Sequence, residues 1–310
     1  MKNDKKEISQ IGLGLSQLNN NLYNEKKFTV KNINSLIKYA IKKGIKYFDT
    51  AHNYGETEKI LGKLNKDLKK KIHIFTKAGF KSNGIRDFSQ PYLKKKINHS
   101  LKNLKTESLD TFFLNKPSYK EIIENDLLNF FYKLRKKGIV KNFGIIVGND
   151  KLNNLVYKNE DIKFFSFMYN LLNIDDEKYI KLAKKNEKIV ITRSPFNSGL
   201  LTNNFSQNLR FSEKDFRFEY FSGKNFNLKK NKIIELQKNF KIKKNLFLSS
   251  YYFLRQNKFI DIILFGSYSK AQIKNICLPN KNFFKAEELK IIKKKIKKLN
   301  NFVKTNDQKT

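Results

Sequence analysis

The stretch KYFDTAHNYGETEKILG, residues 46–62, passes from an apolar run to a polar turn and then to a helical pattern. The run KYFDTA (46–51) is short and contains aromatic and β-branched side chains, which predicts a strand. Apolar residues then recur at helical spacing over 56–64, which predicts a helix. A strand, a turn and a helix are therefore the unit of this region.

The same unit recurs along the chain. Further apolar runs predict strands at 10–15, 72–78, 109–115, 142–148, 164–172, 188–195 and 261–267. Other helical patterns lie at 30–43, 92–104, 121–137, 175–186, 229–240, 246–256 and 286–299. Continuous apolar strands that alternate with helices are typical of a parallel sheet that is covered by helices.

Eight such units in about 300 residues fit a closed barrel better than an open doubly wound sheet. Length alone also allows two ordinary domains. Gly12-Leu13-Gly14 lacks the third glycine and the directly following helix of a Rossmann fingerprint. We therefore expect an α/β chain with a single-domain (β/α)8 TIM barrel over residues 1–302 and a polar tail over 303–310.

One segment, 197–227, is too long for an ordinary connection and is rich in Phe, Asn and Ser. Structureless loops of that length are usually lids or disordered segments. We expect this one to cover a cofactor or a substrate, and a plain mobile insertion is the alternative.

Composition bears on partners and compartment. The formal net charge is +37, but only six of the 65 basic residues are Arg and the lysines are spread over the whole chain. Nucleic-acid contacts favour Arg forks and clustered charge, so we expect no nucleic-acid partner. The N-terminus has no apolar signal region and no apolar run is long enough to span a membrane, so we expect a cytoplasmic protein without a membrane partner. One cysteine and three histidines without zinc-like spacing predict no metal site.

Three polar residues follow or end the predicted strands at 46–51 and 72–78. They are Asp49, Tyr54 and Lys77. Reactive groups of such barrels lie at the carboxyl ends of the strands. A phenol that exchanges a proton near neutral pH needs a cation beside it, and a carboxylate can fix that cation in place. Taken singly, the same residues also suit a helix cap, a turn aromatic and a surface lysine.

The segment YFDTAHNYGETEKILG (47–62) resembles the signature of the aldo-keto reductase family, in which Tyr-Gly follows a strand-end Asp by five residues. The resemblance continues through IGLGLS, IFTKAG, SLDTFFLNKP, MYNLLN, TRSPFNSGLL and FGSYSKAQIKNI, each at the expected strand. It implies a (β/α)8 barrel in which NADPH, or sometimes NADH, reduces an aldehyde or a ketone. It also implies that Asp49, Tyr54 and Lys77 hold three of the four catalytic positions.

The fourth position departs from the family pattern, which has His where this chain has Asn115. An amide N–H can orient a carbonyl oxygen, but it carries no charge and relays no proton. Loss of one polarising donor costs about 100-fold to 1,000-fold in rate. His52 lies two residues before Tyr54 and offers a replacement, although a structural role in the loop is the simpler reading.

The resemblance also implies the residues that hold the dinucleotide. Ser166 stands where the family commonly has a Gln for the nicotinamide amide, and the stretch around Lys270 is one residue shorter than the common form. NADP(H) is expected, with NAD(H) as the alternative. The implied cofactor residues are Ser166, Asn170, Arg193, Ser194, Pro195, Phe196, Ser198, Leu200, Gly266, Ser267, Lys270, Gln272 and Asn275.

Three hypotheses follow. The first is an NAD(P)(H)-dependent oxidoreductase that acts on a small carbonyl or sugar-like substrate. The second is a catalytically weak barrel that binds the dinucleotide as a sensor or partner-binding module. The third is a basic nucleic-acid binder, which would show steeply salt-dependent binding. The sequence leaves the substrate, the direction of reaction and the oligomeric state open.

Overall fold

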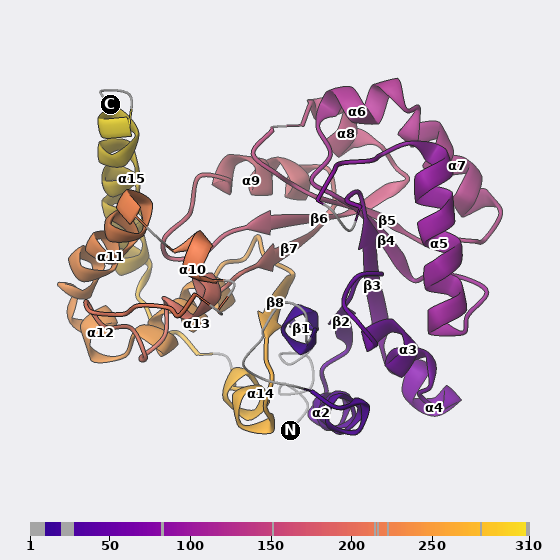
Figure 1. The fold of residues 1–310 in the computed structure, drawn as a ribbon. Helices are drawn as coiled ribbons and strands as arrows, with labels where there is room; N and C mark the ends of the chain where they lie inside the picture. Colours follow the sequence, from indigo (N-terminus) through magenta and orange to yellow (C-terminus); the bar gives the residue numbers. More distant parts are fainter. Residues whose placement is uncertain are drawn as a thin grey trace.

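The computed structural model describes residues 10–19, 28–81, 84–150, 152–213, 215, 217–221, 223–279 and 281–307. Eight parallel strands follow one another around a closed barrel, and β8 pairs with β1 to complete it (Figure 1). The predicted single-domain (β/α)8 barrel is confirmed.

All eight predicted strands are present, most of them shorter than the apolar runs that predicted them. A strand ends where the chain leaves the hydrogen-bonded ladder, whereas the apolar run continues into the first buried residues of the next loop. The strands are β1 (Ile11–Gly14), β2 (Tyr47–Asp49), β3 (His73–Ala78), β4 (Thr111–Asn115), β5 (Phe143–Ile146), β6 (Ile162–Met168), β7 (Ile189–Arg193) and β8 (Ile262–Gly266).

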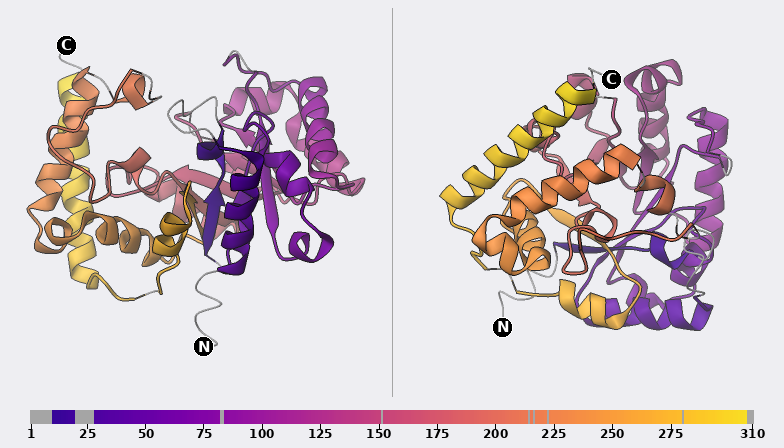
Figure 2. Two further views of the ribbon diagram at one scale, coloured as in Figure 1. Left: turned by 60° about the horizontal axis from the view of Figure 1, so that its bottom comes forward. Right: turned by 60° about the vertical axis from the view of Figure 1, so that its left-hand side comes forward.

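Helices surround the barrel, as Figure 1 and Figure 2 show. They are α2 (Val30–Lys42), α3 (Thr57–Gly62), α4 (Lys66–Lys69), α5 (Gln90–Leu104), α6 (Tyr119–Glu124), α7 (Leu127–Lys136), α8 (Asn154–Lys158), α9 (Glu177–Lys185), α10 (Arg217–Tyr220), α11 (Gly223–Gln237), α12 (Phe240–Lys244), α13 (Leu246–Arg255), α14 (Lys270–Ile276) and α15 (Ala286–Asp307), with short 3-10 turns η1 (Ser16–Leu18) and η2 (Asn197–Gly199).

The helix predicted over 121–137 and the last helix differ from the sequence expectation. The single helix predicted over 121–137 is divided into α6 and α7, because Asp126 takes a left-handed backbone with φ of +49°. Helix α15 continues to Asp307 and so includes residues 303–307 of the expected tail, while residues 308–310 lie outside the described residues.

The interior of the barrel is filled by inward-facing side chains. The Phe75 and Phe113 rings meet edge to face with centroids 5.5 Å apart. Gly144 makes room for them, since a Cβ at this position would lie 2.3 Å from the Phe113 ring. The interior cluster consists of Phe75, Phe113, Ile146, Phe164, Ile191, Ile262 and Leu264.

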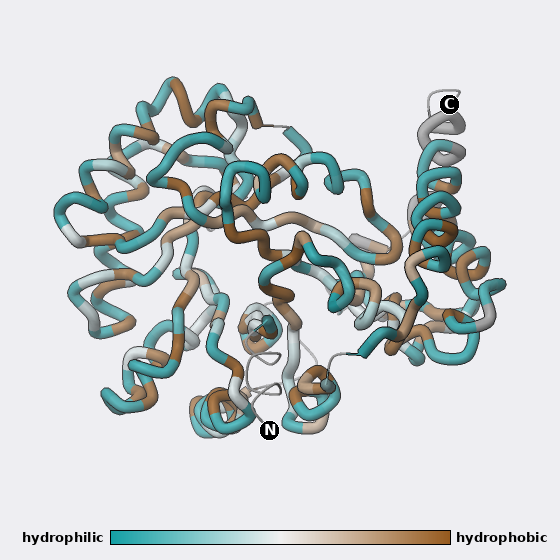
Figure 3. Tube along the Cα trace, turned by 180° about the vertical axis from the view of Figure 1, so that it is seen from behind, coloured by the Kyte–Doolittle hydropathy of each residue, from teal (hydrophilic) through white to brown (hydrophobic). Residues whose placement is uncertain are grey.

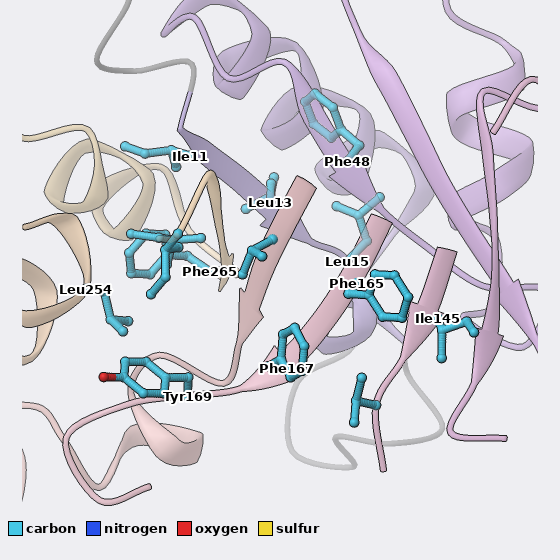
Figure 4. Packing of buried hydrophobic residues seen from close by; sticks show 14 of the residues in the cluster. Ile11, Leu13, Leu15, Phe48, Ile145, Phe165, Phe167, Tyr169, Leu254 and Phe265 are labelled. Carbon is cyan, nitrogen blue, oxygen red and sulfur yellow. The ribbon is translucent and has the colours of Figure 1, made fainter. Parts of the chain in front are cut away.

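A second apolar layer lies between the barrel and its helices (Figure 4). Phe143 of β5 stacks on Phe131 of α7 at 4.1 Å, and Phe165 of β6 stacks on Tyr157 of α8 at 4.6 Å. Burial of each large apolar side chain contributes roughly 1.5–3 kcal/mol, so this layer fixes the helices on the strands. Figure 3 shows hydrophilic residues alternating with apolar ones along the outer helices, as amphipathic helices require.

Candidate active site

The last inward-facing residues of the strands form one layer at the carboxyl end of the barrel. Side chains alternate between faces along a strand, so a residue two positions beyond an interior residue points to the same side. Phe75 lies in the interior and Lys77 therefore reaches the mouth. This layer lines one cavity with Gly14, Asp49, Lys77, Asn115, Ile146, Ser166, Arg193 and Gly266.

Lys77 and Asp49 form a nearly buried ion pair in this layer. Lys77 Nζ lies 2.8 Å from both carboxylate oxygens of Asp49 and donates a third hydrogen bond to the Thr50 carbonyl at 2.9 Å. Burial alone lowers the pKa of Lys77, but the attraction of Asp49 and the hydrogen bonds of Asp49 and Tyr54 outweigh it, so the pKa is raised. The ammonium is therefore held charged and in one place.

Tyr54 lies against this ammonium. Lys77 Nζ is 4.6 Å from the centroid of the Tyr54 ring. The turn that carries Tyr54 is held by its backbone, because Tyr54 N–H donates to Ala51 and the Tyr54 carbonyl accepts from Thr57 Oγ1 at 3.0 Å. Gly55 follows with φ of +59°, a conformation that glycine adopts at no steric cost. Phenol, ammonium and carboxylate thus converge as the sequence predicts.

A buried carboxylate supports the same turn from behind. Glu58 of α3 accepts hydrogen bonds from Thr76 on β3 at 2.8 Å and from Ser100 on α5 at 2.7 Å. It also accepts from Asn103 Nδ2 at 3.0 Å. Three donors satisfy the carboxylate, so α3 is tied both to β3 and to α5. This explains why a Glu belongs to the signature stretch although it does not line the cavity.

Asn115 ends β4 and lines the cavity beside the other three residues. The substitution for His therefore faces the same space as Tyr54. His52 does not take its place, because His52 Nδ1 lies 3.3 Å from the Lys77 carbonyl and the ring is outside the cavity wall that the described residues form. Burial lowers the pKa of His52, and the Lys77 carbonyl offsets that only in part. Its position is that of a structural loop histidine.

The cavity has a volume of about 540 Å³, within the range of small-molecule sites. Ile146 and Leu264 of the interior cluster form its floor. The long 197–227 segment contributes a wall with Ser198, Gly199, Thr202, Asn204, Leu209, Phe211 and Arg217. This segment therefore lies beside Asp49, Tyr54 and Lys77, where a covering loop is expected.

Eight of the thirteen predicted cofactor residues line the same cavity. They are Ser166, Arg193, Ser194, Pro195, Phe196, Ser198, Gly266 and Gln272. The other five, Asn170, Leu200, Ser267, Lys270 and Asn275, lie outside its wall as the described residues define it. The cavity also contains residues that the sequence analysis did not single out, among them Gln17, Lys116, Arg217 and Tyr268.

Asn170 shows why a residue of the right type is not at the cavity. Its Oδ1 accepts from Leu172 N–H at 2.9 Å and its Nδ2 donates to the Ser194 carbonyl at 2.9 Å. The side chain thus closes a turn and holds the loop after β7. Leu200 is fully buried in the outer core, and Asn275 is exposed on α14.

Some buried polar atoms at or near the cavity have no protein partner within the described structure. Ser166 Oγ and Ser267 Oγ are buried and accept or donate no hydrogen bond within the described structure. Gln17 Oε1, also at the cavity wall, is in the same state. A buried polar atom without a partner costs about 1–3 kcal/mol, and a ligand with amide or hydroxyl groups can supply the partner. The Ser166 hydroxyl fits the carboxamide of a nicotinamide in this respect.

The described residues contain neither a candidate metal site nor a candidate membrane span. No group of three or more His, Cys, Asp or Glu side chains is gathered there as metal ligands. No described helix is both long and apolar enough to cross a membrane.

The model of the aldo/keto reductase family matches residues 10–297. The chain belongs to the aldo/keto reductase family. The predicted resemblance is confirmed, and the strand order, the closed barrel and the signature stretch are those of an aldo/keto reductase.

Relatives agree with this membership. The uncharacterized oxidoreductase YqkF of Bacillus subtilis is 29% identical over 203 residues, which cover 63% of each chain. The probable aldo-keto reductase 1 of Glycine max is 35% identical over 146 residues. The matches to curated relatives span between 41% and 63% of the length of those proteins.

Solved structures share the fold. The glycerol dehydrogenase AKR11B4 of Gluconobacter oxydans superposes with a TM-score of 0.76 at 20% identity, over 93% of this chain and 91% of that one. The holo form of aldo-keto reductase AKR11C1 of Bacillus halodurans superposes with a TM-score of 0.73 at 20% identity, over 92% and 91%.

Proposed function

We propose that this aldo/keto reductase is an NAD(P)(H)-dependent oxidoreductase that reduces a small aldehyde or ketone, including sugar-like carbonyl compounds, with NADP(H) as the preferred dinucleotide. The observation that carries this proposal is the Lys77–Asp49 pair against the Tyr54 ring, in the same cavity as Ser166. The phenol of Tyr54, the ammonium of Lys77 and the unpaired hydroxyl of Ser166 therefore line one cavity.

Each catalytic residue has a separate task. Tyr54 O–H donates a proton to the carbonyl oxygen of the substrate as that oxygen gains negative charge. The Lys77 ammonium stabilises the phenolate that remains, and Asp49 holds the ammonium in position by two 2.8 Å contacts. Asn115 donates an amide N–H to the same oxygen and orients it, without a charge of its own.

The dinucleotide would lie along β6, β7 and β8. Ser166 would hold the carboxamide, the loop 194–198 would face the pyrophosphate, and Gly266 with Gln272 would face the adenosine side. A reduced nicotinamide supplies the hydride to the carbonyl carbon when it is bound. The interior cluster closes the cavity toward the centre of the barrel, and residues of the 197–227 segment form part of its wall.

The test is a titration followed by a turnover measurement. The chain has no tryptophan, so NADPH binding is followed by the fluorescence of the nicotinamide itself. We expect saturable binding of NADPH, weaker binding of NADH, and loss of nicotinamide absorbance with a panel of small aldehydes and ketones. Failure of both reduced dinucleotides to bind would overturn the proposal.

Asn115 in the fourth position favours a second candidate, a barrel that binds the dinucleotide with weak catalysis and serves as a sensor or partner-binding module. The Asn115→His variant separates the two candidates. A large gain in carbonyl reduction indicates an enzyme slowed by the substitution. Tight binding of NADPH with no turnover before or after the change indicates the sensor.

A further inference from the structure

A second cavity adjoins the first and shares part of its wall. Its volume is about 1120 Å³, and its lining includes residues that end or follow β5, β6 and β7, the start of α9, and Lys297 and Asn301 of α15. Figure 1 shows α15 at the left and α9 beside β6. The residues common to both cavities are Lys116, Arg193, Ser194 and Ser198. Two of these four are cations, so the passage between the cavities is positively charged.

Arg193 reaches away from the expected dinucleotide. It ends β7, and its Nη2 donates to the carbonyl of Val147 at 2.9 Å, just beyond β5. The guanidinium therefore crosses the mouth of β6 toward β5 instead of turning toward β8. The family resemblance implies a cofactor role for Arg193. Its guanidinium, directed toward β5, is instead suited to contact a ligand group on the side of the cavity away from β8.

Lys116 is held at the other side of the passage. Its backbone takes a left-handed conformation with φ of +61°, which a non-glycine residue adopts only where its surroundings impose it. Two hydrogen bonds do so, from Lys116 N–H to the Ile146 carbonyl at 2.9 Å and from Arg86 Nη2 to the Lys116 carbonyl at 3.0 Å. Lys116 lines both cavities and is in contact with solvent where they meet, although its ammonium group is partly buried.

The electrostatic surroundings of Lys116 are unfavourable to its own charge. Partial burial, Arg193 and Arg86 all lower the pKa of Lys116. Arg86 is itself neutralised by an ion pair with Glu121. An anion between Lys116 and Arg193 would relieve their repulsion and accept hydrogen bonds from both.

Three acidic residues also line the second cavity. They are Asp175, Asp176 and Glu177 at the start of α9, and two of them contact α15. Glu177 pairs with Lys293 of α15 at 2.8 Å, and Asp175 accepts from Asn300 of α15 at 3.0 Å. These contacts fasten the start of α9 to α15 and hold the carboxylates of Asp175 and Glu177 against that helix.

We propose that Lys116 and Arg193 form an anion subsite, and that the substrate is a small aldehyde or ketone that also carries a carboxylate or a phosphate. The subsite rests on the proposed reductase function and narrows its substrate class. Lys116 follows Asn115 directly, so the anion lies a few bonds from the carbonyl that Tyr54 and Asn115 contact. In the closed barrel β4 stands opposite β8, which keeps Lys116 away from the phosphates expected beside Gly266.

Matched pairs of carbonyl compounds test the proposal. Butanal is compared with 4-oxobutanoate, and glyceraldehyde with glyceraldehyde 3-phosphate, each with saturating NADPH. Hydrogen bonds to charged groups predict a kcat/KM about tenfold or more higher for the charged member, and the two pairs show whether carboxylate or phosphate is preferred. Equal kcat/KM for neutral and charged members would overturn the subsite while leaving the reductase function intact.

A charge-neutralising variant locates the effect. Lys116→Gln is expected to reduce the charged-to-neutral ratio of kcat/KM about tenfold, chiefly through KM. Lys120→Gln removes the same charge four residues away, outside both cavity walls as the described residues form them, and is expected to leave the ratio unchanged. Equal loss in both variants would show a diffuse effect of net charge and would contradict the subsite.

Binding without turnover keeps the two proposals apart. 4-Hydroxybutanoate and glycerol 3-phosphate are expected to raise the melting temperature of the protein more than butan-1-ol and glycerol do, and Lys116→Gln is expected to abolish the difference. This result would support the subsite even if no carbonyl compound were reduced. Absence of any difference in the wild-type protein would overturn it whatever the turnover measurements show.

Discussion

The two sides of the first cavity differ in how far the chain satisfies its own polar groups. On the β2 and β3 side, Lys77 makes three hydrogen bonds of 2.8–2.9 Å, to Asp49 and Thr50. On the β6 and β8 side, the buried hydroxyl of Ser166 in the cavity wall has no partner within the described structure, and the same holds for the buried hydroxyl of Ser267, outside that wall. We call these the catalytic side and the cofactor side.

The difference follows from what each side has to do. Catalytic groups act only when their geometry is fixed before the substrate arrives, so their hydrogen bonds belong to the protein. Groups that hold a ligand must keep some bonding capacity for it, at a cost in the stability of the empty protein. Variants on the two sides are therefore expected to differ in the sign of their effects as well as in size.

The largest effect is expected for Lys77→Met. It removes the cation beside Tyr54 and leaves Asp49 buried without a partner, since the Asp49 side chain is 16% exposed. We expect kcat to fall by about 10⁴-fold or more and the free energy of unfolding to fall by roughly 3 kcal/mol. Urea denaturation and NADPH consumption measure the two losses. The double variant Asp49→Asn with Lys77→Met should recover stability without activity, and recovery of both would contradict an electrostatic role.

Tyr54→Phe comes next and separates chemistry from structure. Only the hydroxyl is lost, and the ring remains 4.6 Å from Lys77 Nζ. We expect kcat to fall about 10²-fold to 10⁴-fold, with little change in melting temperature or in NADPH affinity. Single-turnover kinetics and the nicotinamide titration provide the comparison. Wild-type turnover in this variant would assign the proton transfer to another group.

Asn115→His is expected to act in the opposite direction. An imidazole at the end of β4 restores a donor that can also carry charge. We expect kcat/KM for carbonyl reduction to rise about 10-fold to 100-fold, and Asn115→Ala to lower it below the wild-type value. A pH profile of kcat/KM checks that the gain follows the ionisation of the new histidine. If kcat/KM does not rise in Asn115→His while NADPH still binds, the sensor hypothesis is favoured over the enzyme.

The sequence was sufficient for the barrel because each strand is marked locally. Eight apolar runs and the helical patterns between them require no knowledge of distant contacts. Short helices such as α4 and α8 were missed because they contain too few turns to show a period. The division between α6 and α7 was missed because the left-handed Asp126 interrupts a continuous apolar pattern without a glycine or a proline. Helix α11 begins at Gly223, earlier than the predicted residue 229, in a stretch that reads as a loop.

The convergence of Asp49, Tyr54 and Lys77 could be predicted because Asp49 and Lys77 lie at or near strand ends and Tyr54 lies in the turn that follows β2. The cofactor side could be predicted only in part, because backbone geometry decides whether a side chain faces the cavity or closes a turn. The side chain of Asn170 makes its hydrogen bonds to Leu172 N–H in its own turn and to the Ser194 carbonyl. Lys116 was overlooked for a related reason, since its left-handed backbone turns it toward the passage and nothing in the sequence marks that conformation.

Two serine variants compare the sides directly. Ser100 is a satisfied buried hydroxyl that donates to Glu58 behind the catalytic turn, whereas Ser166 is an unsatisfied one at the cofactor. We expect Ser100→Ala to lower the free energy of unfolding by about 1 kcal/mol, and Ser166→Ala to raise it by a similar amount. Ser166→Ala should also weaken NADPH binding about 2-fold to 10-fold. Destabilisation by both variants would mean that Ser166 has a protein partner after all.

The smallest effect concerns His52, which belongs to the catalytic side without lining the cavity. Burial lowers the pKa of His52 below its ordinary value, so between the two values the unfolded chain binds more protons than the folded one. The contribution of His52 to stability is therefore constant above its unfolded pKa of about 6.5 and is lost as the pH falls below it. His52→Gln keeps a polar group near the Lys77 carbonyl but does not titrate, and the melting temperature of this variant should fall less than that of the wild type between neutral and mildly acidic pH. His73, whose pKa burial also lowers, remains in both proteins, so it accounts for the acid dependence that persists in the variant. If the two proteins instead gave parallel curves while turnover in the variant collapsed, His52 would be acting on the substrate and the catalytic side would need a fifth member.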